Sequence, residues 1–311
     1  NPCSEIILRP NQFCNLTEVV VRSTDSVASL TRKIQIATLL GTIQSTFTDF
    51  GYLRKRWQNN TEEERLLGVS LTGIMDSPLM NGKEGVLEKT LKNLRSVAVK
   101  ANKYWAEKFG INQSTAITCV KPSGTVSQLV DSASGIHARH NPYYIRTVRG
   151  DNKDPLTEFM IASGIPNEPD VMKPEHTTVF SFPMKAPKGS VCRNDMTAIE
   201  QLELWKTYAQ HWCEHKPSVT ISVKEEEWVP VGAWCWENFS HLSGVSFLPF
   251  SDHTYQQAPY QDIDKATYEK LVKKMPTSID WQKLQDYEKE DSTKGSQELA
   301  CTAGVCELVD I

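Results

Sequence analysis

The sequence predicts an α/β fold in which short β-strands alternate with long helices. Several short runs rich in β-branched and apolar residues have the length of strands, and between them apolar residues recur with a helical period. Strands separated by helices of this length are expected to run parallel, because a parallel return needs a connection of a dozen or more residues. Such strands would suit part of an α/β barrel and equally a doubly wound sheet, and the pattern does not separate the two.

The expected elements follow one another in a regular order. Gly110 lies just past the second long helix, where glycine is a favourable C-terminal cap. Residues 132–176 are expected to be rich in loops, and the polar end of the chain is expected to form a flexible tail. The expected strands are 16–22, 67–73, 115–121, 177–182 and 218–223, and the expected helices are 26–50, 84–109, 197–214 and 264–274.

Composition and charge exclude some classes of function. The 311 residues are 39% hydrophobic and 23% charged, which is typical of a globular protein. The net charge of -4 and the absence of a basic cluster argue against polymeric nucleic acid as a partner, although a single nucleotide remains compatible. No apolar run approaches the roughly 18 residues of a membrane span, so we expect a soluble, cytoplasmic protein. The first residue is Asn rather than Met, which leads us to expect that processing or fragmentation set this end.

The cysteines are too sparse for a disulfide-stapled secreted scaffold. None has zinc-site spacing, so no protein metal site is expected. Cys119, in an expected strand, and Cys213, in an aromatic helix, are interpreted as core residues. The eight cysteines are at positions 3, 14, 119, 192, 213, 235, 301 and 306.

The N-terminal string NPCSEI places polar and reactive groups at alternate positions. In an extended segment the side chains of Asn1, Cys3 and Glu5 point the same way, so an amide, a thiol and a carboxylate would share one pocket. The alternative is the frayed entry to a strand with one incidental cysteine. Cys14 opens the following strand, and by itself it would be an ordinary buried strand cysteine.

The string KPSGTVSQLVD follows the third expected strand. At a helix start its hydroxyl and backbone N–H groups would suit a phosphate, which is also attracted to the positive end of the helix dipole. The alternative is a Ser/Thr helix cap without a ligand. The His and Arg residues of 134–150 could contact phosphates or a cofactor, or form a solvated basic loop. The candidate phosphate-binding residues are Pro122, Ser123, Gly124, Thr125, Val126 and Ser127.

A third candidate site is the dithiol of CTAGVC, in which Cys301 and Cys306 lie on the polar C-terminal tail. A flexible dithiol can exchange with an internal disulfide and then meet an external reductant. An accidental pair of thiols is the alternative.

Taken together, these motifs resemble those of ribonucleotide reductases. NPCSEI resembles the finger loop of that family. The resemblance implies that Cys3 carries a thiyl radical that abstracts the 3′ hydrogen of the substrate ribose, that Glu5 takes the 3′-hydroxyl proton, and that Asn1 hydrogen-bonds the ribose. It also implies that Cys14 is one of the two thiols that reduce the 2′ position. The other thiol comes from an upstream strand, which this chain lacks.

The later motifs resemble the same family in the same order. The resemblance implies that the loop 122–127 holds the substrate phosphates, although the extra Val126 departs from the family pattern and leaves the Ser127 hydroxyl assignment less secure. It further implies that Cys301 and Cys306 re-reduce the active site. The string of 134–150 resembles the adenosylcobalamin-dependent branch, in which neither His137 nor His140 is expected to bind cobalt.

The resemblance implies a specific architecture and activity. It predicts the second half of a ten-stranded α/β barrel with its finger loop in residues 1–250, a peripheral helical segment in 251–290 and a mobile redox tail in 291–311. The implied reaction is reduction of ribonucleotides, expected to be triphosphates, with adenosylcobalamin as cofactor. The implied partners are a thioredoxin-like reductant and an N-terminal half chain. The alternatives are a non-catalytic barrel fragment that binds nucleotide or a partner chain, and a dithiol oxidoreductase.

Overall fold

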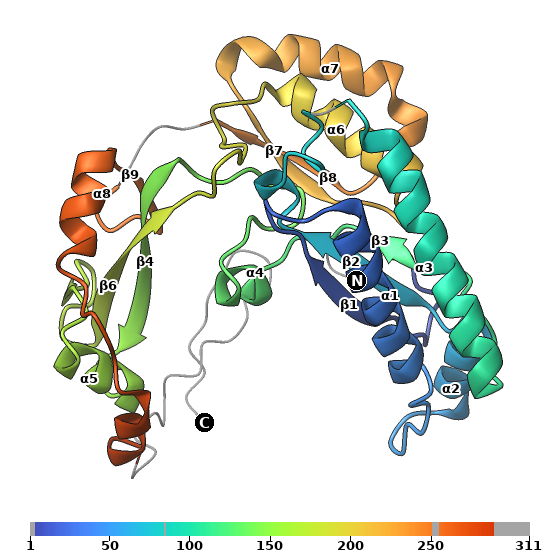
Figure 1. The fold of residues 1–311 in the computed structure, drawn as a ribbon, viewed down its shortest axis with the longest axis horizontal. Helices are drawn as coiled ribbons and strands as arrows, with labels where there is room; N and C mark the ends of the chain where they lie inside the picture. Colours follow the sequence, from blue (N-terminus) through green and yellow to red (C-terminus); the bar gives the residue numbers. More distant parts are fainter. Residues whose placement is uncertain (1–3, 84, 251–254, 289–311) are drawn as a thin grey trace. The chain divides into compact units, whose positions relative to one another are not determined.

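The computed structural model describes residues 4–83, 85–250 and 255–288 and has an α/β fold (Figure 1). It divides into two compact units. The first contains the described residues of 1–139 and 186–251, and the second contains those of 140–185 and 252–311. We describe each unit separately.

Five parallel strands form the frame of the first unit. In β1, β2 and β3 the neighbouring strands pair in parallel register. Val120, directly after β3, forms a parallel bridge with Pro217, directly before β7, and β7 pairs in parallel with β8. The strands therefore follow the order β1-β2-β3-β7-β8. Their bounds are Asn15–Val20 for β1, Leu67–Thr72 for β2, Thr118–Cys119 for β3, Val219–Val223 for β7 and Val245–Pro249 for β8.

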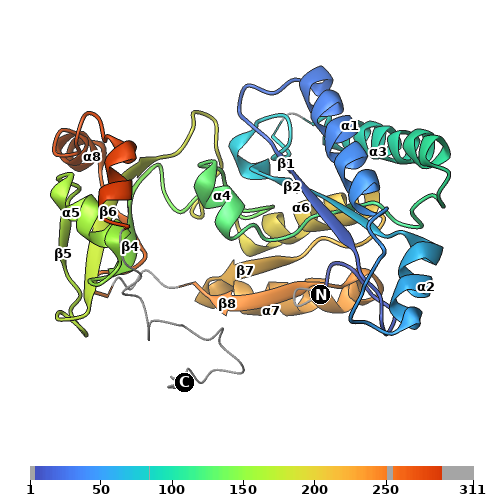
Figure 2. The same ribbon diagram turned by 90° about the horizontal axis from the view of Figure 1, so that it is seen from below.

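Helices lie between these strands in the chain. Helix α1 packs on β1 and β2 and against α3, so both helices lie on one side of these strands (Figures 1 and 2). Gly110 ends α3 in the left-handed conformation, as its position in the sequence indicates. The helices of this unit are α1 (Val27–Gln44), α2 (Lys55–Glu64), α3 (Leu87–Phe109), α4 (Thr125–Leu129), α6 (Ala198–His211) and α7 (Trp228–Glu237), with 3₁₀ turns η1 (Ile74–Asp76), η2 (Glu225–Glu227) and η3 (Phe239–His241).

The two faces of the parallel strands differ in polarity. Side chains such as Val19, Leu67 and Val69 join the main hydrophobic core beneath the helices. On the opposite face, Gly68 leaves room for the N-terminal segment. A Cβ atom there would lie 2.5 Å from the Leu16 side chain and 2.8 Å from that of Ile6. Glycine at this position therefore lets the segment around residue 6 pack directly on β2.

The second unit has a different architecture from the one expected. Its sheet has the order β5-β6-β4-β9, and all of its pairings are antiparallel. Helix α5 is capped by Asp154, whose side chain accepts a hydrogen bond from the Leu156 N–H. The elements are β4 (Tyr143–Asp151), α5 (Pro155–Ala162), β5 (Asn167–Pro169), β6 (Thr177–Lys185), β9 (Tyr260–Asp262), α8 (Lys265–Val272) and the 3₁₀ helix η4 (Trp281–Asp286).

Two expectations about the fold are corrected here. The run 177–182 is a strand, but it pairs antiparallel with β4, so it is not a fourth parallel strand. The stretch 132–176 is rich in loops as expected, but it also contains the nine residues of β4 and the eight of α5. The expected boundary at residue 250 assigned 140–185 to the barrel, whereas this segment groups with β9 because β4 pairs with both β6 and β9.

Candidate functional site

The Glu5 carboxylate is the best-defined functional group of the N-terminal motif. Its side chain is fully buried, with 0% exposed. Oε2 accepts a hydrogen bond from Lys121 Nζ at 2.8 Å, and Oε1 accepts one from the Ser218 hydroxyl. The main-chain oxygen of Glu5 accepts a bond from the Lys216 N–H at 3.0 Å. The segment is therefore attached to the β3 and β7 region by both its backbone and its side chain.

The surroundings of Glu5 favour its ionised form. Burial alone would raise the pKa of the carboxyl. The hydrogen bonds from Lys121 and Ser218 and the charge of Lys121 lower the pKa and together outweigh burial, so it lies below its ordinary value. Glu5 is thus a carboxylate at neutral pH although no water reaches it. An ionised, desolvated carboxylate next to a hydroxyl-bearing substrate is suited to accept a proton.

The serine-rich loop 122–127 begins one residue after Lys121. Ser123 Oγ donates to Glu18 Oε2 at 3.1 Å and accepts from the Ser127 N–H at 2.9 Å. Between these two buried serines, residues 124–126 are exposed. The loop therefore presents an exposed turn that leads into the short helix α4.

Ser127 differs from what the motif suggests. Its side chain is fully buried, and its hydroxyl donates to the Ser123 carbonyl oxygen at 2.6 Å. The Ser127 hydroxyl therefore stabilises the loop through a hydrogen bond within it. The exposed residues of the loop are Pro122, Gly124, Thr125 and Val126.

Cys14 lies on the same face of β2 as the N-terminal segment. A Cβ atom added to Gly68 would be 3.4 Å from Cys14 Sγ, and Cys14 packs in a small cluster with Ile6 and Cys119. Burial raises the pKa of the Cys14 thiol to about 12, against a smaller opposing effect of the Lys121 charge. The thiol is consequently protonated at neutral pH.

Two further cysteines, Cys119 and Cys213, are interpreted from the sequence as core residues. Cys119 and Cys213 are buried, and burial raises the pKa of each thiol. Both are therefore inert core residues in this structure. Asn1, Cys3, Cys301 and Cys306 lie outside the described residues, and their assigned roles stay predictions.

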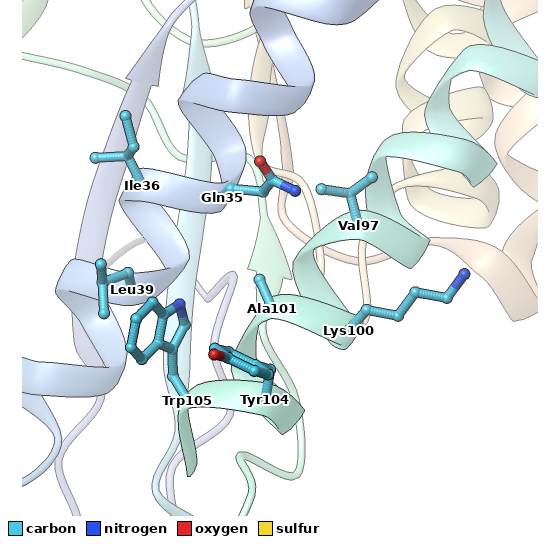
Figure 3. A pocket seen from close by; sticks show the side chains of 8 residues that line it. All are labelled: Gln35, Ile36, Leu39, Val97, Lys100, Ala101, Tyr104 and Trp105. Atoms are coloured by element: carbon cyan, nitrogen blue, oxygen red, sulfur yellow. The ribbon is translucent and has the colours of Figure 1, made fainter. Parts of the chain in front are cut away.

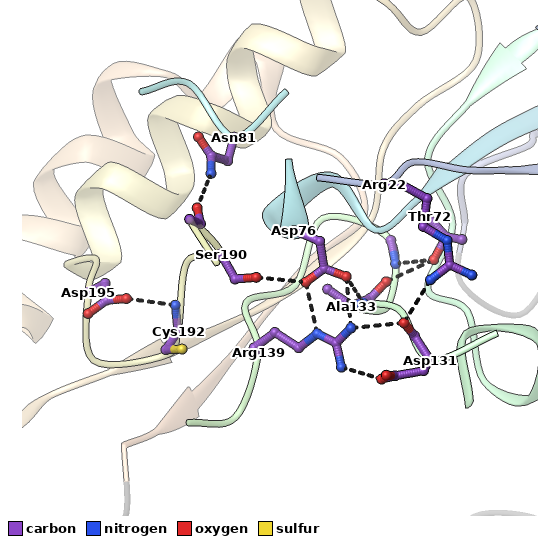
Figure 4. Close-up of polar contacts among 12 residues, drawn as sticks. Arg22, Thr72, Asp76, Asn81, Asp131, Ala133, Arg139, Ser190, Cys192 and Asp195 are labelled. Atoms are coloured by element: carbon purple, nitrogen blue, oxygen red, sulfur yellow. Dashed lines mark hydrogen bonds and ion pairs between the residues drawn. The ribbon is translucent and has the colours of Figure 1, made fainter. Parts of the chain in front are cut away.

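A buried ion-pair network holds the segment that follows the phosphate loop (Figure 4). Arg139, 4% exposed, binds the Asp76 carboxylate through two nitrogens, Nε at 2.8 Å and an Nη at 2.9 Å. Its other terminal nitrogen contacts Asp131 Oδ1 at 2.7 Å. Asp76 also accepts from the Ala133 N–H at 2.9 Å. Arg139, from the string 134–150, thus links the turn η1, which follows β2, to the segment 131–139.

His137 of the same string is structural as well. Its Nδ1 contacts the Ser134 carbonyl oxygen at 3.0 Å, and its Nε2 accepts a hydrogen bond from the Thr220 N–H at 3.0 Å. These contacts fix a neutral ring with the proton on Nδ1, and burial lowers the pKa of His137. In the second unit, His140 Nε2 lies 2.7 Å from Asp262 Oδ1. His137 is therefore held by contacts within the protein, and it matches neither a ligand contact nor a solvated basic loop.

A pocket of about 470 Å³ lies on the helical side of the first unit (Figure 3). It opens between α1 and α3, whereas Glu5 and Cys14 belong to the opposite face of the strands. This pocket is therefore separate from the Glu5 site. Its lining residues are Gln35, Ile36, Leu39, Val97, Lys100, Ala101, Tyr104 and Trp105.

Sequence reasoning missed two residues of the site, Lys121 and Ser218. Lys121 immediately precedes the loop 122–127, and Ser218 immediately precedes β7, in which apolar and polar residues alternate. Alternation of this kind is the sequence signal of a strand with one polar face, and it could have pointed to Ser218. Within the described residues, no group of three His, Cys, Asp or Glu side chains could hold a metal ion, and no described helix is long and apolar enough to cross a membrane.

A solved structure shares the fold of this chain. The crystal structure of a B12-dependent (class II) ribonucleotide reductase matches 93% of this chain with a TM-score of 0.80 and 25% sequence identity. The match spans 44% of that enzyme's chain. No family model matches the sequence.

The relatives found by sequence share one name. The adenosylcobalamin-dependent ribonucleoside-triphosphate reductase of Lactobacillus delbrueckii subsp. bulgaricus is 26% identical over 308 residues, which cover 90% of this chain and 41% of the relative. The probable enzyme of the same name from Dictyostelium discoideum is 28% identical and covers 99% of this chain and 40% of the relative. The Euglena gracilis enzyme is also 28% identical. The chain is thus similar to adenosylcobalamin-dependent ribonucleoside-triphosphate reductases and spans about two fifths of their length.

Proposed function

We propose that this chain forms the catalytic part of an adenosylcobalamin-dependent reductase that converts ribonucleotides, expected to be triphosphates, to 2′-deoxyribonucleotides. One observation carries the proposal: the buried Glu5 carboxylate is bonded to Lys121, the residue directly before the loop 122–127. A ribose beside Glu5 would have its phosphates within reach of that loop. The homologues and the structural neighbour support the same reaction.

We further propose that the parallel strands are half of a ten-stranded barrel. The order β1-β2-β3-β7-β8 supplies five parallel strands. Among the described residues, no strand pairs with the outer edge of β1 or of β8. Open edges of this kind normally have to be covered. An N-terminal half chain with five further strands would cover both edges, and it would also bring the second 2′-reducing thiol.

The proposed reaction divides its steps among the residues of this chain. The Cys3 sulfur radical takes the 3′ hydrogen atom of the ribose, and Glu5 accepts the proton of the 3′ hydroxyl while Asn1 orients the sugar. The 2′ hydroxyl leaves as water, and Cys14 with its partner thiol supplies two electrons and two protons by closing to a disulfide. Cys3 then returns the hydrogen atom to C3′, which regenerates its sulfur radical, and Glu5 returns its proton to the 3′ oxygen. Cys301 and Cys306 then reduce that disulfide by exchange, and a thioredoxin-like protein reduces them in turn.

The state of Cys14 suits its proposed part in this reaction. With a pKa of about 12 the thiol keeps its proton at neutral pH, so it can supply that proton to the departing hydroxyl. The five cysteines that the structure describes, Cys14 included, are all free thiols. Free thiols fit a reducing compartment such as the cytoplasm, where we place the enzyme.

The described residues are compatible with adenosylcobalamin as the proposed cofactor. Both ring nitrogens of His137 are engaged and His140 contacts Asp262, so these two residues are not offered as cobalt ligands. This suits a cofactor that carries its cobalt inside its own ring. When bound, adenosylcobalamin supplies the cobalt–carbon bond whose homolysis starts the radical chemistry.

The test combines the chain with its proposed N-terminal half, adenosylcobalamin, a dithiol and ribonucleoside triphosphates. Formation of 2′-deoxyribonucleotide is expected, and Cys3→Ala should abolish it. Cys235→Ala is the matched control, since Cys235 is outside the site and should not matter. Turnover that survives Cys3→Ala would refute the radical mechanism. If a disulfide-exchange activity then persisted and was lost in Cys301→Ser, the chain would be a dithiol oxidoreductase instead.

A further inference from the structure

Glu5 is held by one charged and one neutral donor. Lys121 Nζ lies 2.8 Å from Oε2, and the Ser218 hydroxyl donates to Oε1, so each oxygen of the carboxylate has its own partner. The Lys121 side chain is 18% exposed, whereas the Glu5 side chain is fully buried. Water screens an ion pair this deeply buried only weakly, so the positive charge of Lys121 strongly favours the ionised form of Glu5.

The backbone of Lys121 is fixed from two sides. Its N–H donates to the Ser70 hydroxyl of β2 at 2.9 Å. Gly135, with a φ of +53°, packs against its carbonyl, since a Cβ atom there would lie 2.5 Å from the Lys121 oxygen. The direction of the lysine side chain is therefore set by the packing of three segments.

The neighbouring ionisable groups do not replace Lys121. The Cys14 and Cys119 thiols are close enough to interact electrostatically with Lys121, but both are neutral, because burial raises their pKa values far above 7. Lys216 contributes its backbone N–H to Glu5. Ser218 donates a hydrogen bond without bringing a charge.

We propose that Lys121 is the positioning residue that keeps Glu5 ionised and holds it at a fixed place relative to the phosphate loop. This inference rests on the proposed reductase function, in which Glu5 accepts the 3′-hydroxyl proton. The proton moves from the ribose oxygen to the carboxylate, and no further reactant is needed. The same residue begins the loop at Pro122, so it sets the spacing between the base and the phosphates.

The removal of Lys121 has a consequence of known sign. Burial would remain and would then raise the Glu5 pKa, since its strongest opposing influence is lost. A Glu5 that is protonated at working pH cannot accept the ribose proton. Loss of Lys121 should therefore move the acid limb of the pH–rate profile to higher pH.

The test measures Glu5 directly in the chain combined with its proposed N-terminal half. Infrared difference spectra with Glu5→Gln as the blank follow the carboxyl band of Glu5 through a pH titration. Lys121→Met should raise its pKa by about one to three units, the usual effect of one close opposite charge. Lys121→Arg keeps the charge and should move the pKa much less. Lys216→Met is the matched control, and it should leave the titration unchanged.

A second readout ties the titration to catalysis. The acid limb of kcat/KM should shift in Lys121→Met by the same amount as the Glu5 pKa, and Lys121→Arg should restore its position. If Lys121→Met does not fold, Ser218→Ala replaces it and should give a smaller upward shift, because that variant loses a neutral hydrogen bond.

Two outcomes separate this inference from the proposed function. An unmoved Glu5 titration in Lys121→Met, or a shift of equal size in Lys216→Met, would overturn the role of Lys121. If Lys121→Met shows the expected shift of the Glu5 titration but the wild-type assembly forms no deoxyribonucleotide, the Lys121–Glu5 coupling is supported and the reductase function is refuted.

Discussion

The buried Arg139 network offers a sharp test of how the loop region is stabilised. We expect Arg139→Met to leave the Asp76 carboxylate, which is 2% exposed, without its two charge-assisted hydrogen bonds. Breaking a buried ion pair from one side costs about 3 to 5 kcal/mol, because the remaining charge stays buried and uncompensated. That is a large part of the roughly 5 to 15 kcal/mol by which a domain is stable.

A second substitution should restore part of the stability that Arg139→Met loses. Asp76→Asn removes the stranded charge but keeps a side-chain oxygen that can accept from the Ala133 N–H. We therefore expect the double variant Arg139→Met/Asp76→Asn to be more stable than Arg139→Met alone. Arg9→Met is the surface control: Arg9 pairs with Glu63 at 3.0 Å, but both side chains are well exposed, so its loss should cost less than about 1 kcal/mol.

Urea unfolding followed by tryptophan fluorescence measures these changes. All tryptophans except Trp281 lie in the first unit, so the signal reports mainly on the unit that contains Arg139. A loss of stability in Arg139→Met no larger than that in Arg9→Met would refute the reasoning. So would a double variant less stable than Arg139→Met, because the stranded Asp76 charge would then not be the cause.

Four further outcomes are expected from the same structure. Glu5→Gln should fold but lose about 10²- to 10⁴-fold in turnover, because a neutral amide cannot act as the base; unchanged deoxynucleotide formation would exclude it as that base. The pKa of Asp25 is lowered because its hydrogen bonds, led by the 2.6 Å contact from Lys33, outweigh the opposing effect of burial. A lowered carboxyl pKa contributes stability above the unfolded value near 3.9, and this is lost as pH falls through the folded pKa. Asp25→Asn should therefore cost about 1 kcal/mol at pH 7 in urea unfolding, and a difference that persisted at pH 2 would contradict this. Because its pKa is about 12, the Cys14 thiol should react with iodoacetamide at pH 8 at least about 100-fold more slowly in the folded chain than in urea, as measured by mass spectrometry; equal rates would show that it is not protected. Gly135→Ala, at φ +53° with a backbone oxygen 2.5 Å from the new Cβ, should destabilise the chain by about 1 to 3 kcal/mol in urea unfolding, and wild-type stability would mean that the backbone there relaxes freely.

Local patterns in the sequence were sufficient for much of the first unit. The run 218–223 alternates polar and apolar residues and is the strand β7, and Gly110 ends α3 in the left-handed conformation. The short motifs also led to the reductase resemblance that the homologues confirm. Periodicity, capping and short motifs are properties of neighbouring residues, so they can be read before the chain is folded.

Only the tertiary structure decided which distant segments pair. The run 177–182 has the composition of a strand wherever it lies, but its antiparallel partner β4 lies in a stretch that looked like loop. Likewise, no local pattern links Glu5 to Lys121, which are 116 residues apart in the chain. Strand partners and buried ion pairs depend on which surfaces meet after folding, and residues far apart in sequence carry no local mark of that meeting.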